Sequence, residues 1–121
     1  MKNKLLFFVL LLSATSLMAQ NRPLIESKEA IIAQAIHELD SAMRAPDGEL
    51  YQFFLKENIK GQYTMQLTIR DKGHVVSVFV ADKKNADIPS QNKLKDKLLE
   101  YRFGFKMPKN KDYKFNYQFT L

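Results

Sequence analysis

The side chains that most often perform chemistry are few in this sequence and lie far apart. Its only two histidines, His37 and His74, fall in different predicted elements, and neither has a second metal-ligating side chain at a suitable spacing. The chain has no cysteine, and none of its serines lies in a Gly-x-Ser-x-Gly turn. The acidic residues are scattered, and the four glycines form no phosphate-binding loop. We therefore expect no catalytic residue, no metal ligand and no cofactor, and a small hydrolase is the least favoured class.

Recognition through the backbone is the chemistry that the carboxyl-terminal stretch favours instead. From Tyr113 to Leu121 the sequence YKFNYQFTL alternates between apolar or aromatic residues and polar residues. This period of two predicts a β-strand with one buried and one exposed face. A terminal strand in a small sheet can also leave one row of N–H and C=O groups unpaired, and such a row pairs with a partner unless it is protected.

The composition indicates one small domain without a strong preference for polyanions. The chain has 121 residues and a formal net charge of +6. Without the two lysines of residues 1–19, 17 basic and 13 acidic side chains remain, a net charge of +4. This mild surplus is spread along the chain, so we expect no nucleic acid as a partner.

The amino-terminal stretch has the pattern of an export signal. Lys2 and Lys4 precede the apolar run Leu5–Leu12, and small and polar residues lead to a candidate cleavage site after Ala19. A retained membrane anchor is the alternative, but the apolar run is much shorter than the ~20 residues of a spanning helix. We therefore predict a signal peptide over residues 1–19, no stable membrane span after its cleavage, and a periplasmic or secreted protein.

Three helices are expected in the remaining chain. The longest runs from an N-cap at Ser27 to Arg44 within an amino-terminal segment of residues 20–46. A shorter helix begins with Asp47 as its cap, and a third begins with Ser90 and ends near Tyr101. The apolar stripe of the first helix is predicted to consist of Ile32, Ala35, Ile36, Leu39, Ala42 and Met43.

Two further strands form a predicted hairpin. The first covers Gln62–Arg70, the turn is Asp71–Gly73, and the second strand covers His74–Ala81 with Val76, Val78 and Val80 on one face. A polar loop is predicted to follow from Asp82 to Pro89. Together with the last strand, these elements predict an α+β fold, in which two helices precede a small three-stranded antiparallel sheet.

From Gly48 onward the chain resembles the carboxyl-terminal domain of TonB energy transducers, in the form common in Bacteroidetes. The resemblance rests on four stretches and their order: GELYQFFLKENIK (48–60), YTMQLTIRDKGHVVSVFV (63–80), LLEYRFGFKMP (98–108) and YKFNYQFTL (113–121). It implies a β-β-α-β domain over residues 47–121. The long spacer of a transducer is replaced here by one helix, and the family's Pro-Gly after an aromatic residue becomes Lys106-Met107-Pro108. The resemblance therefore implies the fold and a mode of binding, and it does not imply energy transduction.

Two functions follow as hypotheses. In the family, the last strand offers its free edge to an extended segment of an outer-membrane transporter, and the same edge can pair with a second copy of the chain. The partner-binding residues would then be Tyr113, Lys114, Phe115, Asn116, Tyr117, Gln118 and Phe119. The alternative is a structural or inhibitory accessory protein that docks through the helix Ser27–Arg44. Exposure of Ile32, Ile36 and Leu39 as a row would favour this alternative.

Overall fold

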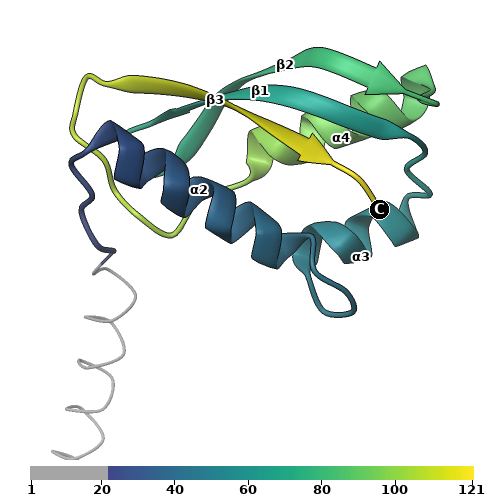
Figure 1. Ribbon diagram of the computed structural model, residues 1–121, viewed down its shortest axis with the longest axis horizontal. Helices are drawn as coiled ribbons and strands as arrows, with labels where there is room; N and C mark the ends of the chain where they lie inside the picture. Colours follow the sequence, from purple (N-terminus) through teal and green to yellow (C-terminus); the bar gives the residue numbers. More distant parts are fainter. Residues whose placement is uncertain (1–21) are drawn as a thin grey trace, which may run out of the picture.

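The computed structural model describes residues 22–121, which form three helices and three strands in the predicted order (Figure 1). The predicted signal peptide lies outside the described residues. The α+β fold, with two helices before a three-stranded antiparallel sheet, is confirmed. The elements are α2 (Lys28–Ala42), α3 (Glu49–Lys56), β1 (Gln62–Arg70), β2 (His74–Lys84), α4 (Ile88–Glu100) and β3 (Asp112–Phe119).

The central strand of the sheet is β1, which pairs with β2 on one side and with β3 on the other. All three helices lie on one face of the sheet, with α4 near β2 and α2 near β3 (Figure 1). The β1 side chains that point to the helices are completely buried, whereas Thr64 and Gln66 on the opposite face are half-buried. One face of the sheet thus carries the core and the other meets water, as alternation in β1 predicts. The fully buried β1 side chains are Tyr63, Met65, Leu67 and Ile69.

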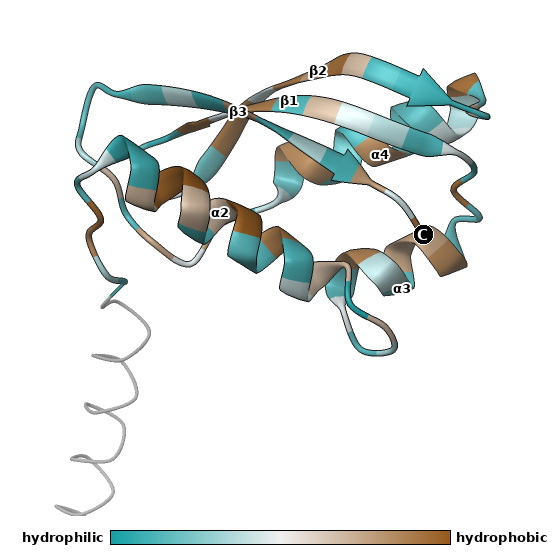
Figure 2. Ribbon diagram, in the orientation of Figure 1, coloured by the Kyte–Doolittle hydropathy of each residue, from teal (hydrophilic) through white to brown (hydrophobic). Residues whose placement is uncertain are grey.

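The helix α2 belongs to this same core. Its N-cap is Ser27, as predicted, and the Ser27 hydroxyl accepts a hydrogen bond from the Ala30 amide at 3.0 Å. Figure 2 shows brown apolar stripes along α2 between teal polar positions. The predicted stripe was incomplete because Ile31 is fully buried, while Ile32 and Ile36 are half-buried at its border. The core stripe of α2 consists of Ile31, Ala35, Leu39 and Ala42.

The starts of the other two helices differ from the prediction. Helix α3 begins after Gly48, without a side-chain cap, so the predicted capping role of Asp47 is wrong. Helix α4 is capped by Asp87, whose carboxylate accepts a hydrogen bond from the Ser90 amide at 2.7 Å. Ser90 is instead buried, and its hydroxyl accepts a hydrogen bond from the Lys60 amide at 3.0 Å. Ser90 thus joins α4 to the start of β1 and is not free to cap.

Strand β2 also departs from the prediction, because two β-bulges interrupt its pairing with β1. It continues to Lys84, three residues beyond the predicted end, into the stretch predicted as a loop. The register shifts leave Val76 and Ala81 without a partner in β1. Each bulge changes which residues face the helices. Val75 is therefore buried and Val76 is 39% exposed, the reverse of the predicted faces.

A connecting segment, residues 101–111, joins α4 to β3 and closes one end of the sheet. The Phe103 amide donates a hydrogen bond to the Gly73 carbonyl at 3.0 Å, and the Met107 amide donates to the Asp71 carbonyl at 2.7 Å. A side chain at Gly73 would meet the Phe103 carbonyl at 2.7 Å, and φ at Gly73 is +79°, so the turn requires glycine. Near Lys106 the segment also pairs with Leu24 of the amino-terminal lead.

Candidate functional site

Strand β3 forms one edge of the sheet, and all seven candidate partner-binding residues lie on it. It pairs with β1 without a bulge over its whole length, from Asp112 opposite Arg70 to Phe119 opposite Tyr63. Residues of a strand direct their backbone groups alternately to the two sides. Within residues 22–121, the backbone of β3 makes no hydrogen bond outside its ladder with β1. A regular row of donors and acceptors is thus present on its outer side.

The opposite edge, formed by β2, is less suited to pairing with another strand. Its two bulges break the even spacing of backbone groups that a partner strand needs. Its beginning is also occupied, because His74 pairs with Arg102 of the connecting segment. Of the two edges, β3 is therefore the one that offers a continuous row.

The side chains of β3 divide between the two faces of the sheet as the sequence predicts. Phe115 and Phe119 are buried, and Tyr113 and Tyr117 are half-buried, on the face that the helices cover. The exposed side chains on the other face are Lys114, Asn116 and Gln118. Leu121 was predicted to continue the apolar face, but it lies beyond the strand and is 57% exposed. Four aromatic side chains thus hold the strand in place, while its backbone and three polar side chains remain accessible.

Helix α2 supplies the surface next to this edge. The Tyr117 hydroxyl donates a hydrogen bond to an Asp40 carboxylate oxygen at 2.6 Å. Burial, and then this carboxylate, raise the pKa of Tyr117 well above its ordinary value. Because residues four apart share one side of a helix, Ile32 and Ile36 lie on the same flank as Asp40. This flank of Ile32, Ile36 and Asp40 is therefore the side of α2 that meets β3.

The other flank of α2 fixes the helix to the connecting segment. The Gly104 amide donates a hydrogen bond to the Glu38 carboxylate at 2.8 Å. The Tyr101 ring is half-buried nearby, and burial, followed by the negative charges of Glu38 and Glu49, raises the pKa of Tyr101 to about 12. Helix α2 is thus held at both flanks, which fixes the position of its Ile32–Asp40 side relative to β3.

The sequence did not reveal the bulges of β2 or the proximity of α2 to β3. The β2 sequence departs from alternation at Val75–Val76 and again over the apolar run Val78–Ala81, so this pattern alone does not locate a bulge. No sequence signal marks the hydrogen bond between Tyr117 and Asp40, because the two residues are 77 positions apart.

The histidines are not brought together. His37 lies exposed on α2, and His74 opens β2. No group of three or more His, Cys, Asp or Glu side chains in residues 22–121 is placed to hold a metal ion. Over the same residues, no helix has the length and apolar character needed to cross a membrane.

Comparisons of the chain with protein-family models, with curated proteins and with solved structures found no match. The functional argument therefore depends on the geometry of β3 and its surroundings.

Proposed function

We propose that this chain is an exported, periplasmic protein-binding module that resembles the TonB carboxyl-terminal domain. Its partner is a protein that adds an extended segment to the outer edge of β3. The observation that carries the proposal is the unbroken register of β3 at the edge of the sheet, without another backbone partner in the described residues. Backbone hydrogen bonds supply affinity in this mode, and alternate side chains supply specificity.

The surroundings of β3 indicate which kind of segment fits. A strand added to β3 would continue the two faces of the sheet. Its side chains on the helix side would lie near Ile32 and Ile36, which are half-buried and offer apolar contacts. Its side chains on the open side would lie near Lys114 and Asn116, which are exposed. The preferred partner segment is therefore extended and alternates between apolar and polar or acidic residues.

The resemblance to TonB domains makes an outer-membrane transporter the preferred source of that segment. A second copy of the chain is the other source, because two β3 strands can pair around a two-fold axis. We do not propose docking through the apolar stripe of α2. Leu39 is completely buried, and Ile32 and Ile36 are half-buried against the chain's own core, so these three residues do not form the exposed row that would favour docking through this helix.

The test places a photo-cross-linking amino acid at Gln118 on β3 and, as the matched control, at Lys84 on β2. Both positions are exposed, and they lie on opposite edges of the sheet. We expect a cross-linked envelope protein, or a cross-linked dimer, from position 118 alone. Mass spectrometry of the adduct and sedimentation of the purified chain distinguish the two products. Equal cross-linking from both positions would contradict recognition through β3.

The accompanying substitution is Asn116→Pro, which removes one backbone donor from β3. We expect it to abolish the cross-link at Gln118. The control is Ala81→Pro, because Ala81 is an exposed bulge residue on the other edge. Thermal unfolding establishes that each variant folds.

Amide hydrogen exchange supplies a second measurement that needs no substitution. We expect alternate amides of β3 to exchange rapidly in the free chain and to become protected in the complex. Protection confined to β2 would refute the assignment even if Asn116→Pro failed to fold.

A further inference from the structure

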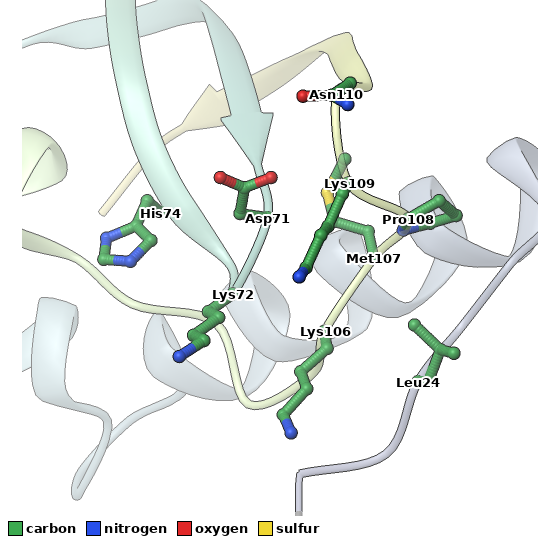
Figure 3. A pocket seen from close by; sticks show the side chains of 9 residues that line it. All are labelled: Leu24, Asp71, Lys72, His74, Lys106, Met107, Pro108, Lys109 and Asn110. Atoms are coloured by element: carbon green, nitrogen blue, oxygen red, sulfur yellow. The ribbon is translucent and has the colours of Figure 1, made fainter.

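The hairpin end of the sheet carries a cavity with a basic rim that the proposed function does not use. The cavity has a volume of about 620 Å³ and lies between the Asp71–Gly73 turn, the connecting segment and Leu24 (Figure 3). Three lysines line it, one from the turn and two from the connecting segment, and Asp71 is the single carboxylate among the lining residues. The three lysines are Lys72, Lys106 and Lys109.

These lysines are not neutralised by neighbours. None of the three forms an ion pair within residues 22–121. Arg22 adds a fourth cation, and its guanidinium donates hydrogen bonds to the carbonyls of Lys72 and Phe103 at 3.1 and 3.2 Å. Leu24 stands beside them with 57% of its surface exposed. An exposed apolar side chain beside a cluster of cations is a combination that can contact an anionic lipid surface.

The course of the chain gives a second reason to expect a membrane here. The apolar run Leu5–Leu12 precedes Arg22 by ten residues, a span of at most about 35 Å. Whenever that run is in a bilayer, the chain enters the domain at this basic end. The cations are thus on the part of the domain that is tethered closest to the lipid headgroups.

We propose that the hairpin end of the domain binds the surface of a bilayer that contains anionic phospholipids. The contact uses Lys72, Lys106 and Lys109 for the headgroups and Leu24 for the interface. This contact does not depend on the β3 edge, because none of its four residues lies on β3. It also persists as a weaker, salt-dependent affinity after the leader is removed.

The experiment uses the chain that begins at Gln20. All core side chains lie between Ile25 and Phe119, so this chain keeps the complete core. It is sedimented with vesicles of phosphatidylcholine alone and of phosphatidylcholine mixed with phosphatidylglycerol. We expect binding to the mixed vesicles only, and we expect that binding to weaken as salt is added.

The decisive variant replaces Lys72, Lys106 and Lys109 with glutamine. Since each lysine near an anionic surface contributes to binding, we expect the partition coefficient to fall about a hundredfold. The matched control replaces Lys56, Lys83 and Lys84 with glutamine, which changes the net charge by the same amount as the decisive variant. In this control Lys83 and Lys84 lie at the other end of β1, about 30 Å from the hairpin turn, where Lys84 pairs with Gln62. Lys56 is the last residue of α3, shortly before β1 in the chain.

Each of three results with vesicles would overturn the proposal: equal binding to both kinds of vesicle, equal loss in both triple variants, or unchanged binding in the Lys72, Lys106 and Lys109 variant. Binding to a soluble sulfated polysaccharide but not to vesicles would also overturn it, because the partner would then be a polyanion and not a bilayer. Thermal unfolding of both variants shows whether lost binding reflects lost structure.

Discussion

Tyr117 is the residue that most directly couples the candidate edge to the rest of the fold. Its ring packs against Phe119, with centroids 4.8 Å apart, and its hydroxyl reaches Asp40 on α2. Replacing a single hydroxyl of this kind removes about 1 kcal/mol of stability. The hydrogen bond therefore holds α2 beside β3, and with it the flank of Ile32 and Ile36.

Two half-buried tyrosines predict a loss of stability at alkaline pH. The pKa of Tyr101 is raised to about 12, mainly by burial, and the pKa of Tyr117 is raised for the same reason. Above the ordinary pKa of 10.0 the unfolded chain releases these protons while the folded chain still holds them. The free energy of unfolding should therefore be unaffected by these groups below pH 10 and fall as the pH rises towards 12.

Urea unfolding between neutral pH and pH 12 measures this effect, and absorbance at 295 nm follows tyrosine ionisation. The double variant Tyr101→Phe, Tyr117→Phe should show a shallower decline above pH 10. At neutral pH, Tyr113→Phe is the control for the lost hydrogen bond of Tyr117. Within the described residues the Tyr113 hydroxyl makes no hydrogen bond. A decline of the same steepness in the double variant would show that other groups cause it.

Among the elements, α2 decides whether the amino-terminal segment is part of the domain or an appendage. Leu39 and Ile31 are inaccessible to solvent and share one cluster with residues of β1 and β3. We therefore predict that Leu39→Ala lowers the free energy of unfolding by about 2–5 kcal/mol, since it leaves a cavity in a packed core. Chemical unfolding measures this loss.

The control for this prediction is Ala33→Ser, an exposed position on the same helix. It should change stability by no more than about 0.5 kcal/mol. A similarly small effect of Leu39→Ala would mean that α2 detaches from the core in solution. The face of β3 that α2 covers and the apolar stripe of α2 would then both be open to partners.

The elements also show what the sequence could and could not predict. The limits of β1 and the faces of its residues agree with the prediction because β1 is central and its apolar and polar residues alternate, although Thr68 on the open face is also buried. The faces of Val75 and Val76 in β2 were predicted wrongly, whereas Val78 and Val80 pack against the core as predicted. A bulge depends on the opposing strand, and the β2 residues alone do not fix the pairing. The cap of α4 was misplaced for a similar reason. Asp87 and Ser90 can both cap a helix, and the contact of Ser90 with the Lys60 amide decides between them.

For the candidate site, the sequence predicted the strand and its faces but not its neighbours. Alternation from Tyr113 onward placed all seven residues on β3. That β3 lies at an edge, and that the other edge is bulged, follows only from the pairing of all three strands. The proximity of Asp40 to Tyr117 depends on how the chain folds back over 77 positions.

For the molecule as a whole, the position of the amino terminus determines what the domain can reach. We predict that the leader is cleaved after Ala19, so that the mature chain begins at Gln20 and is released from the leader into the periplasm. The physical reason is the short apolar run Leu5–Leu12 followed by small residues before the cut. The intact mass of the protein recovered from the periplasmic fraction measures the cleavage.

A substitution separates a cleaved leader from a retained anchor. Ala19→Tyr places a bulky residue at the cleavage position and should leave the full-length chain in the membrane fraction. Ala14→Ser, five residues earlier, is the control and should be processed normally. If the unaltered chain already stays full-length in the membrane, the domain is an anchored one. The β3 edge would then act close to the membrane that holds the leader, and a partner in the opposite membrane would have to span the distance.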